Sequence, residues 1–199
     1  MDLCGVTHTL TPGMVLANYR RGLFPMGSPD HSLITWRRPS RRAIIPLDRF
    51  HVSRSLLRTL RLGRFRVTFD QDFASVIQAC ADRPGEGTWI TAPILSVYRR
   101  LHDSGDAHSV EVWTPSGLAG GVYGVAIGCA FFAESKFHRE RDMSKVALAQ
   151  LVFRLRERGF SLLEVQYLTP HLARFGAIEI PDAAYMKLLR EAVQGECRF

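Results

Sequence analysis

Hydrophobic positions recur at two spacings along the chain, and each spacing predicts a type of element. Leu16, Tyr19 and Leu23 follow one another at helical spacing, and Thr11 stands before them as a capping residue, so a first helix is predicted here. Over Arg64–Asp70 apolar and polar residues alternate strictly, which is typical of a half-buried strand. The same two criteria predict the elements of the remaining chain.

These further elements have a regular order. They are a helix near His51–Leu62, a helix over Phe73–Cys80, a helix capped by Thr91 that ends at Gly105, strands over His108–Trp113, Leu118–Ile127 and Cys129–Ser135, a helix over Ser144–Arg158, a strand over Ser161–Leu168, a short helix over Pro170–Phe175, an extended segment over Ala177–Ile180 and a last helix over Asp182–Val193. In the second half of the chain, strands come first and then alternate with helices. This order predicts an α+β fold with helices packed on a mixed sheet.

Positive charge is concentrated in one part of the chain. Residues 37–66 hold ten arginines and one acid, Asp48, so this block carries a net charge of +9, whereas the whole chain carries +7. Arg54, Arg58 and Arg61 form a basic stripe on the helix near His51–Leu62, opposite its apolar stripe. Such a block is typical of a surface that binds a polyanion such as RNA. A solvated helix face in an arginine-rich protein is the alternative.

Composition limits the classes of protein to consider. No apolar run reaches the ~18 residues of a membrane-spanning helix, and the first residues lack the basic and apolar regions of a signal peptide. We therefore expect a cytoplasmic protein whose four cysteines are free thiols, most simply small buried side chains. Neither the cysteines nor the seven histidines have the spacing of a metal site, so no metal is expected.

Three polar residues stand on strands that are otherwise apolar. Glu134 follows the run CAFFA, and Glu164 and Gln166 lie two apart in SLLEVQYL, a spacing that directs both to one face of a strand. An unpaired buried carboxylate is unfavourable, so Glu134 is either solvated at a sheet edge or part of a site. Two neighbouring strand ends with such groups predict a polar pocket. Each residue alone is equally compatible with a position on the surface.

Glycines interrupt the strands of the second half, at Gly120, Gly121, Gly124 and Gly128. Glycine weakens a strand, so its presence indicates a bulge or the close approach of another segment, or room for a ligand above the sheet. No phosphate-binding loop motif precedes a helix here.

Two tryptophans, Trp36 and Trp89, lie in predicted loops outside any periodic helix face. A loop tryptophan can cover the edge of a core, or it can stack on a nucleobase.

Several motifs together resemble one family. They are LTP…YRRGLFPM (Leu10–Met26), HVSRS (His51–Ser55), EGTWIT (Glu86–Thr91), HSVEVW (His108–Trp113), GGVYGVA (Gly120–Ala126), SKVAL (Ser144–Leu148) and FGAIEIP (Phe175–Pro181). In this order and spacing, over about Leu10–Val193, the chain resembles the bacterial leucyl/phenylalanyl-tRNA–protein transferases.

The resemblance implies a fold, an activity and partners. It implies an acetyltransferase-like catalytic domain over residues 67–199, after a small basic domain over residues 1–66. The implied reaction moves leucine or phenylalanine from aminoacyl-tRNA to proteins with N-terminal arginine or lysine, which marks them for degradation. The α-amine attacks the ester without a covalent enzyme intermediate, metal or coenzyme, so no cofactor is expected. A monomer without membrane contact is also expected.

The resemblance also implies roles for individual residues. Trp36 and Trp89 would hold the 3′ adenosine of the tRNA, and Glu134 and Ser135 would line the junction between donor and acceptor. Glu164 and Gln166 would accept the proton of the amine. Five arginines of the basic block would grip the tRNA through its phosphates: Arg41, Arg42, Arg54, Arg58 and Arg61.

The chain departs from the family pattern at several of these positions. Ala133 and Lys136 replace a glycine and a methionine, and Val122 replaces another methionine of the pocket for the amino-acid side chain. Glu164 stands where aspartate is usual, and Thr169 where asparagine is usual. Arg38 likewise takes the place of a serine.

Lys136 is the departure with the largest chemical effect. An ammonium inside the pocket would be unfavourable without a paired acid and would change the preferred amino acid. Alternatively, its stem lines the pocket while the ammonium reaches solvent, and the preference is kept.

Three rival functions follow. An acetyl-CoA-dependent N-acyltransferase needs a glycine-rich loop where this chain has His138–Ser144 without glycine. The others are tRNA-dependent synthesis of cell-wall peptides and tRNA binding without catalysis.

Overall fold

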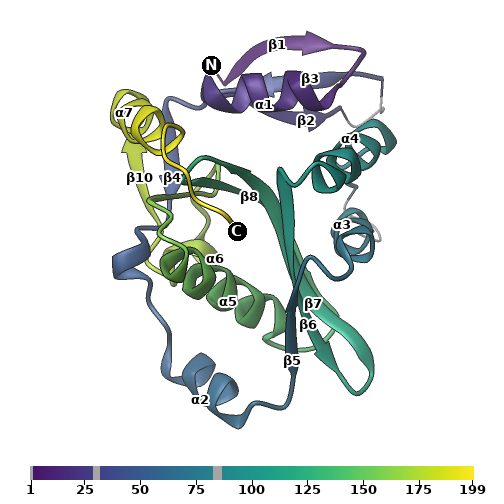
Figure 1. The fold of residues 1–199 in the computed structure, drawn as a ribbon, viewed down its shortest axis with the longest axis vertical. Coiled ribbons are helices and arrows are strands. Elements are labelled where there is room, and N and C mark those ends of the chain that lie inside the picture. Colours follow the sequence, from purple (N-terminus) through teal and green to yellow (C-terminus); the bar gives the residue numbers. More distant parts are fainter. Residues whose placement is uncertain (1, 29–31, 83–86) are drawn as a thin grey trace.

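A computed structural model describes residues 2–28, 32–82 and 87–199 and contains two β-sheets. The larger sheet has seven strands in the order β10-β4-β9-β8-β7-β6-β5 (Figure 1). Among the described strand pairs of this sheet, only β8–β9 is parallel. The strands are β4 (Arg41–Ile44), β5 (Arg66–Phe69), β6 (Ala107–Thr114), β7 (Gly117–Ile127), β8 (Ala130–His138), β9 (Leu162–Glu164) and β10 (Ile178–Pro181). The α+β class with a mixed sheet is therefore confirmed.

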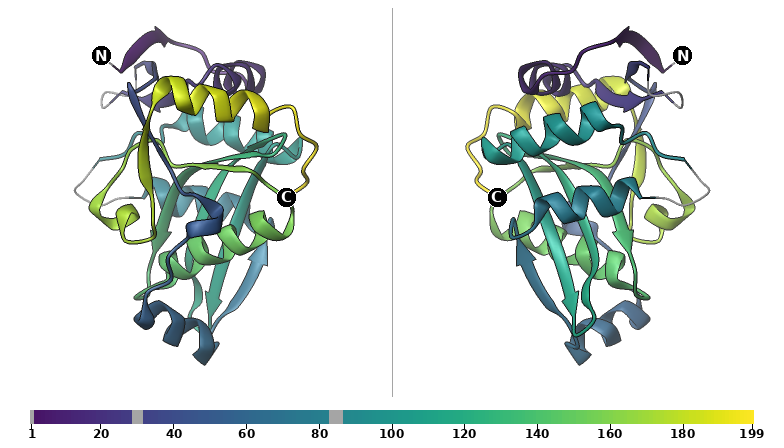
Figure 2. Two further views of the ribbon diagram at one scale, coloured as in Figure 1. Left: turned by 90° about the vertical axis from the view of Figure 1, so that its left-hand side faces the viewer. Right: turned by 90° about the vertical axis from the view of Figure 1, so that its right-hand side faces the viewer.

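Helices cover both faces of this sheet and divide the core into two clusters. On one face lies α5 (Met143–Glu157), with α2 (Arg54–Leu62) and the 3₁₀ helix η1 (Leu47–Arg49) packed beside it. The other face carries α3 (Phe73–Ala81), α4 (Ala92–Asp103), α1 (Pro12–Arg20) and α7 (Asp182–Ala192) (Figure 2). The short α6 (Pro170–Ala173) follows β9.

The smaller sheet covers one end of the molecule. Its strands are β1 (Leu3–Thr7), β2 (Phe24–Gly27) and β3 (Ile34–Arg37), in the order β1-β3-β2 (Figure 1). The division at residue 66 stays a prediction, and β4, which precedes that point, lies inside the seven-stranded sheet between β10 and β9.

Local sequence signals account for most helix ends. Thr11 caps α1 by accepting a hydrogen bond from the backbone of Met14, and Ser53 caps α2 in the same way. Gly63 ends α2 in the left-handed conformation, with φ of 60°. The helix predicted after the capping residue Thr11 and the helices predicted over Phe73–Cys80 and Ser144–Arg158 are thus confirmed to within a few residues.

One predicted strand is shorter than expected, and the strands near the N-terminus were not predicted. Ser161–Leu168 was expected to be one strand, but β9 ends at Glu164 because Gln166 adopts a left-handed conformation with φ of 56°. The strands before residue 45 were not predicted, because each has four or five residues and too few alternating positions to be recognised.

The glycines of β7 allow close packing. A Cβ on Gly120 would lie 2.7 Å from the backbone of Met143 at the start of α5, and one on Gly124 would lie 2.4 Å from the Phe131 ring. Of the interpretations that the sequence left open for these glycines, the contacts support the close approach of other segments rather than room for a ligand.

The expectation of four free thiols is wrong for one pair. Cys129 and Cys197 form a disulfide, whereas Cys4 and Cys80 are free. The turn before β8 lies against the end of α7, where a Cβ on Gly128 would lie 2.7 Å from a carbonyl oxygen of Ala192. The C-terminal segment therefore passes Cys129, a proximity that 68 residues of separation conceal in the sequence.

In the described part of the chain, no helix combines the length and the apolar character required to cross a bilayer.

Candidate active site

The site is built around an irregularity in the pairing of β7 with β8. Gly124 pairs with Ala133, and the next residue of β7, Tyr123, pairs with Ser135, so Glu134 is an extra residue without a partner. Such a β-bulge redirects side chains and is common beside active sites. After the bulge the alternation changes phase, and Lys136 lies opposite Val122 on the α5 side of the sheet. Glu134 was expected at a strand end but lies in the middle of β8.

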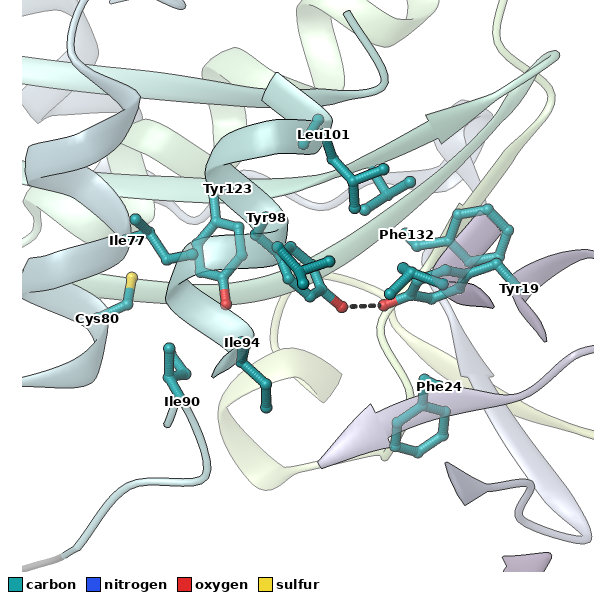
Figure 3. Packing of buried hydrophobic residues seen from close by; sticks show 14 of the residues in the cluster. Tyr19, Phe24, Ile77, Cys80, Ile90, Ile94, Tyr98, Leu101, Tyr123 and Phe132 are labelled. Atoms are coloured by element: carbon teal, nitrogen blue, oxygen red, sulfur yellow. Dashed lines mark hydrogen bonds between the residues drawn. The ribbon is translucent and has the colours of Figure 1, made fainter. Parts of the chain in front are cut away.

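The Glu134 carboxylate accepts hydrogen bonds from three side chains. The Tyr19 hydroxyl of α1 donates to Oε1, the Tyr98 hydroxyl of α4 lies 3.3 Å from Oε2, and Gln166 Nε2 donates to Oε1 over 3.1 Å. The two tyrosine hydroxyls also lie 2.8 Å apart within the core (Figure 3). Three segments far apart in sequence therefore converge on one carboxylate of β8.

This environment raises the pKa of the Glu134 carboxyl well above its ordinary value. Burial is the largest cause and raises its pKa to about 8; the negative charge of Glu164 acts in the same direction, while the hydrogen bond from Tyr19 opposes the shift. Burial and the Glu134 charge raise the pKa of Tyr19 and Tyr98 well above the usual value, so both phenols remain protonated donors. Glu134 can therefore take up or release a proton near neutral pH.

Arg42 and Glu164 form a fully buried ion pair behind the site. Arg42 Nε donates to Glu164 Oε1 over 2.6 Å, and its Nη1 donates to the Gly22 carbonyl over 2.7 Å. The guanidinium also lies over the rings of Phe24 and Tyr185, at 4.8 and 4.5 Å from their centroids. Both side chains of the pair are inaccessible to solvent. The expectation that Arg42 contacts tRNA is therefore wrong, since no phosphate can reach it in this arrangement.

Gln166 connects this pair to Glu134. Its backbone N–H donates to Glu164 Oε1 over 2.7 Å, while its side chain reaches Glu134. Because the chain turns at Gln166, the two side chains do not share one strand face as expected, although they belong to one hydrogen-bond network. The expected role of Glu164 as a proton acceptor for substrate is also corrected, because its carboxylate is buried against Arg42.

Three cavities meet at Glu134. The first, the cationic cavity, has a volume of about 800 Å³ and is lined among others by Lys136, His138, Arg139 and His171. The second, the small apolar cavity, measures about 70 Å³. Val122, Ala133, Leu148, Val165 and Leu172 form its apolar wall, and Ser135, Lys136 and Gln166 complete it. The third, the aromatic chamber, measures about 200 Å³ and lies between β2 and the segment that follows β9. It is lined by Phe24, Pro25, Met26, Trp89, Tyr167 and Leu172, with Gln166 and Thr169.

The two tryptophans have different positions. Trp89 lines both the cationic cavity and the aromatic chamber, so it is available to a ligand. Trp36 lies on β3, is 7% exposed and packs in the core, which corrects its expected position in a loop that binds adenosine. Glu86, the first residue of the motif around Trp89, lies outside the described residues.

The other expected site residues divide between cavities and surface. Ser135 and Lys136 line both the cationic and the small apolar cavity, Val122 lines the latter, and Thr169 caps α6 beside the cationic cavity and the aromatic chamber. The α2 arginines lie at the end of the molecule opposite the smaller sheet (Figure 1), around a surface depression lined by Arg54, Leu57, Arg58, Arg61 and Leu62. Arg41 pairs with Glu179 over 3.3 Å at the surface.

Sequence reasoning missed Tyr19 and Tyr98 as site residues. Each stands at an apolar helix position and is fully buried, so the sequence pattern does not distinguish it from an ordinary core residue. Within the described ranges, no group of three or more potential metal ligands occurs.

Comparison with known proteins identifies relatives over most of the chain. A sequence model of leucyl/phenylalanyl-tRNA protein transferases matches residues 44–190. A leucyl/phenylalanyl-tRNA–protein transferase from Cereibacter sphaeroides is 52% identical over 191 residues, which are 96% of this chain and 88% of the relative. One from Rubrobacter xylanophilus is 53% identical over 186 residues, 93% of this chain and 96% of the relative.

A solved structure shares the fold at low identity. FemX matches with a TM-score of 0.51 and 13% identity, over 76% of this chain and 64% of FemX. This likeness shows the fold alone.

Proposed function

Because the chain belongs to the leucyl/phenylalanyl-tRNA–protein transferase family, we propose that it moves leucine or phenylalanine from aminoacyl-tRNA to the N-terminal arginine or lysine of acceptor proteins. The chain is an aminoacyltransferase, as are its relatives, and the two amino-acid preferences are the proposed part. We further propose that it acts as a cytoplasmic monomer and that its products are marked for degradation. The observation that carries the chemistry is Glu134, a carboxyl with a pKa of about 8 where three cavities meet.

Glu134 is proposed as the base of the reaction. The acceptor amine attacks the ester carbonyl, a C–N bond forms, and the bond between this carbon and the ribose oxygen breaks. The amine proton passes to Glu134 and then to the departing ribose oxygen, so atoms and charge balance without a covalent enzyme intermediate. An N-terminal ammonium has a pKa of about 8, close to that of Glu134, so nucleophile and base are both partly unprotonated over the same pH range.

Neighbouring groups would hold this base in place. Tyr19, Tyr98 and Gln166 donate hydrogen bonds to its carboxylate, which fixes its direction. Glu164 is proposed as a positioning residue, because it accepts the Gln166 N–H and is itself anchored by Arg42. Gln166, as an amide, would orient the base and the amine rather than take the proton itself.

The cationic cavity suits the 3′ end of tRNA. Lys136 and Arg139 supply positive charge for phosphate, and Trp89 offers a ring for stacking on a base. Burial, followed by the charge of Lys136, lowers the pKa of His171, so this imidazole is neutral at physiological pH. The α2 arginines, which line a separate surface depression, would contact the body of the tRNA, so affinity should fall as salt concentration rises.

The small apolar cavity is proposed to hold the donor side chain. Its wall of Val122, Leu148 and Val165 suits leucine, and it adjoins Glu134 directly. Lys136 lines this cavity and the cationic one. We propose that its stem lies along the apolar wall while its ammonium extends into the cationic cavity, which keeps the preference for apolar donors.

Transfer from a panel of labelled aminoacyl-tRNAs to a peptide with N-terminal arginine tests this function. We expect RNase-sensitive labelling from leucyl-tRNA and no labelling of the same peptide with an acetylated N-terminus. Binding of tRNA without labelling from any donor would refute the function and favour a non-catalytic relative. Labelling from polar donors in preference to leucine would refute only the proposed position of Lys136.

A further inference from the structure

The aromatic chamber differs in charge from the cavity on the other side of Trp89. None of its described lining residues is basic, whereas Lys136, His138 and Arg139 line the cationic cavity, where they outnumber its one acid besides Glu134, Asp82. A polyanion and a basic peptide approaching Glu134 would therefore be directed to different cavities. Building on the proposed function, we propose that the aromatic chamber binds the side chain of the basic N-terminal residue of the acceptor and that Asp2 is its charge partner.

The chamber has the dimensions and walls for such a side chain. Its volume is about 200 Å³, and a dry cavity of about 150 Å³ is enough for a benzene molecule. Apolar residues such as Met26 and Leu172 suit the aliphatic stem of arginine or lysine. The rings of Phe24 and Tyr167 suit its cationic end, because a ring face attracts a cation.

A carboxylate stands beside this cluster of rings. The Tyr167 hydroxyl donates a hydrogen bond to Asp2 Oδ2 over 3.2 Å, and the Tyr167 ring packs edge-on against Phe24, with 5.7 Å between centroids. Asp2 itself is held by its backbone, since its carbonyl accepts a bond of 2.7 Å from the Arg38 N–H. A guanidinium or ammonium at this end of the chamber would gain a charge-assisted hydrogen bond.

The opposite end of the chamber meets the reacting groups. Glu134 and Gln166 line it there, so an acceptor with its side chain in the chamber would place its α-amine beside the proposed base. Arg37 approaches the Tyr167 phenol from β3. Its positive charge would oppose an incoming basic side chain, whereas the charge of Asp2 would attract it, so the two residues should have opposite effects on acceptor binding.

Steady-state transfer from leucyl-tRNA to peptides that differ only in their first residue tests the inference. With Asp2→Asn we expect KM for peptides beginning with arginine or lysine to rise about tenfold, equivalent to about 1.4 kcal/mol. KM for a peptide beginning with citrulline, the neutral isostere of arginine, should not change, and neither should KM for leucyl-tRNA. Tyr167→Phe should produce a smaller rise of the same kind, and Arg37→Gln should lower KM for the basic peptides.

Asp48→Asn is the matched control, because Asp48 is an exposed carboxylate on η1 that does not line the chamber. An active Asp2→Asn enzyme with unchanged KM for basic peptides would overturn the inference. A rise in KM for leucyl-tRNA instead would also overturn it and assign the chamber to tRNA. Absence of transfer by the unmodified protein to any peptide would refute the proposed function itself, an outcome distinct from both.

Discussion

Replacing Glu134 by glutamine tests the base directly with little change of shape. The amide keeps one oxygen that can accept the hydrogen bond from Tyr19, places an NH2 group where Tyr98 donates, and cannot take up a proton. A general base typically contributes on the order of 10²- to 10⁴-fold to the rate. We therefore expect kcat to fall by about that factor in Glu134→Gln, while KM for leucyl-tRNA changes little.

The same substitution should change how stability depends on pH. The pKa of Glu134 is raised from the ordinary 4.5 to about 8 on folding, so the folded state binds the proton more tightly than the unfolded state. The resulting stabilisation is fully present below pH 4.5 and is lost as pH rises through about 8. Between about pH 6 and about pH 9 this amounts to at most about 2.7 kcal/mol. Because Glu134 borders open cavities, solvent screening should reduce it to about 1–2 kcal/mol.

Urea unfolding of both proteins at the two pH values measures this quantity. Titration of all other groups is common to the unmodified protein and to Glu134→Gln, so it cancels in the difference between them. We expect the unmodified protein to lose about 1–2 kcal/mol more than the variant between about pH 6 and about pH 9. Parallel pH dependence of the two proteins would refute the raised pKa, and an unchanged kcat would refute the role as base.

Further substitutions test the scaffold of the site. Arg42→Met should destabilise the fold by about 3–5 kcal/mol in urea unfolding, because it leaves the Glu164 carboxylate buried without its partner; a loss below about 1 kcal/mol would show that the pair is not buried in solution. Gly124→Ala should lower the free energy of unfolding by about 1–3 kcal/mol, because the added Cβ has no space, and an unchanged free energy would contradict the close packing. Cys197→Ser should remove up to about 4 kcal/mol of stability under oxidising conditions, with activity retained. The unmodified protein should lose the same amount when reduced; insensitivity of its stability to reductant would argue against the bond between Cys129 and Cys197.

Elements whose hydrophobic period extends over several turns or residues could be predicted from the sequence. Leu16 and Tyr19 lie on α1, and alternation over Arg64–Asp70 marks β5, because burial of one face imposes these spacings. The four-residue strands β2, β3 and β4 carry too few positions for a period to emerge. Their pairing depends on contacts with distant segments, such as that of β4 with β9 and β10.

The candidate site was only partly predictable for a related reason. Glu134, Glu164 and Gln166 were recognisable as polar residues in apolar strands, because an unpaired buried carboxylate is unfavourable. Which of them meets substrate depends on the bulge in β8 and on the left-handed turn at Gln166, and these are properties of the backbone. Arg42 was assigned to the surface because arginine is rarely buried, and only the fold brings it to Glu164.

Single-turnover transfer is the most direct test of the central claim that this chain joins an amino acid to a protein N-terminus with Glu134 as base. Leucyl-tRNA, an excess of the enzyme and a peptide with N-terminal arginine are mixed, and the peptide is followed by mass spectrometry. We expect the unmodified protein to add one leucine residue to the α-amine, and Glu134→Gln to do so at least about 100-fold more slowly while still binding leucyl-tRNA. A peptide of unchanged mass, or equal rates for the two proteins, would contradict the account.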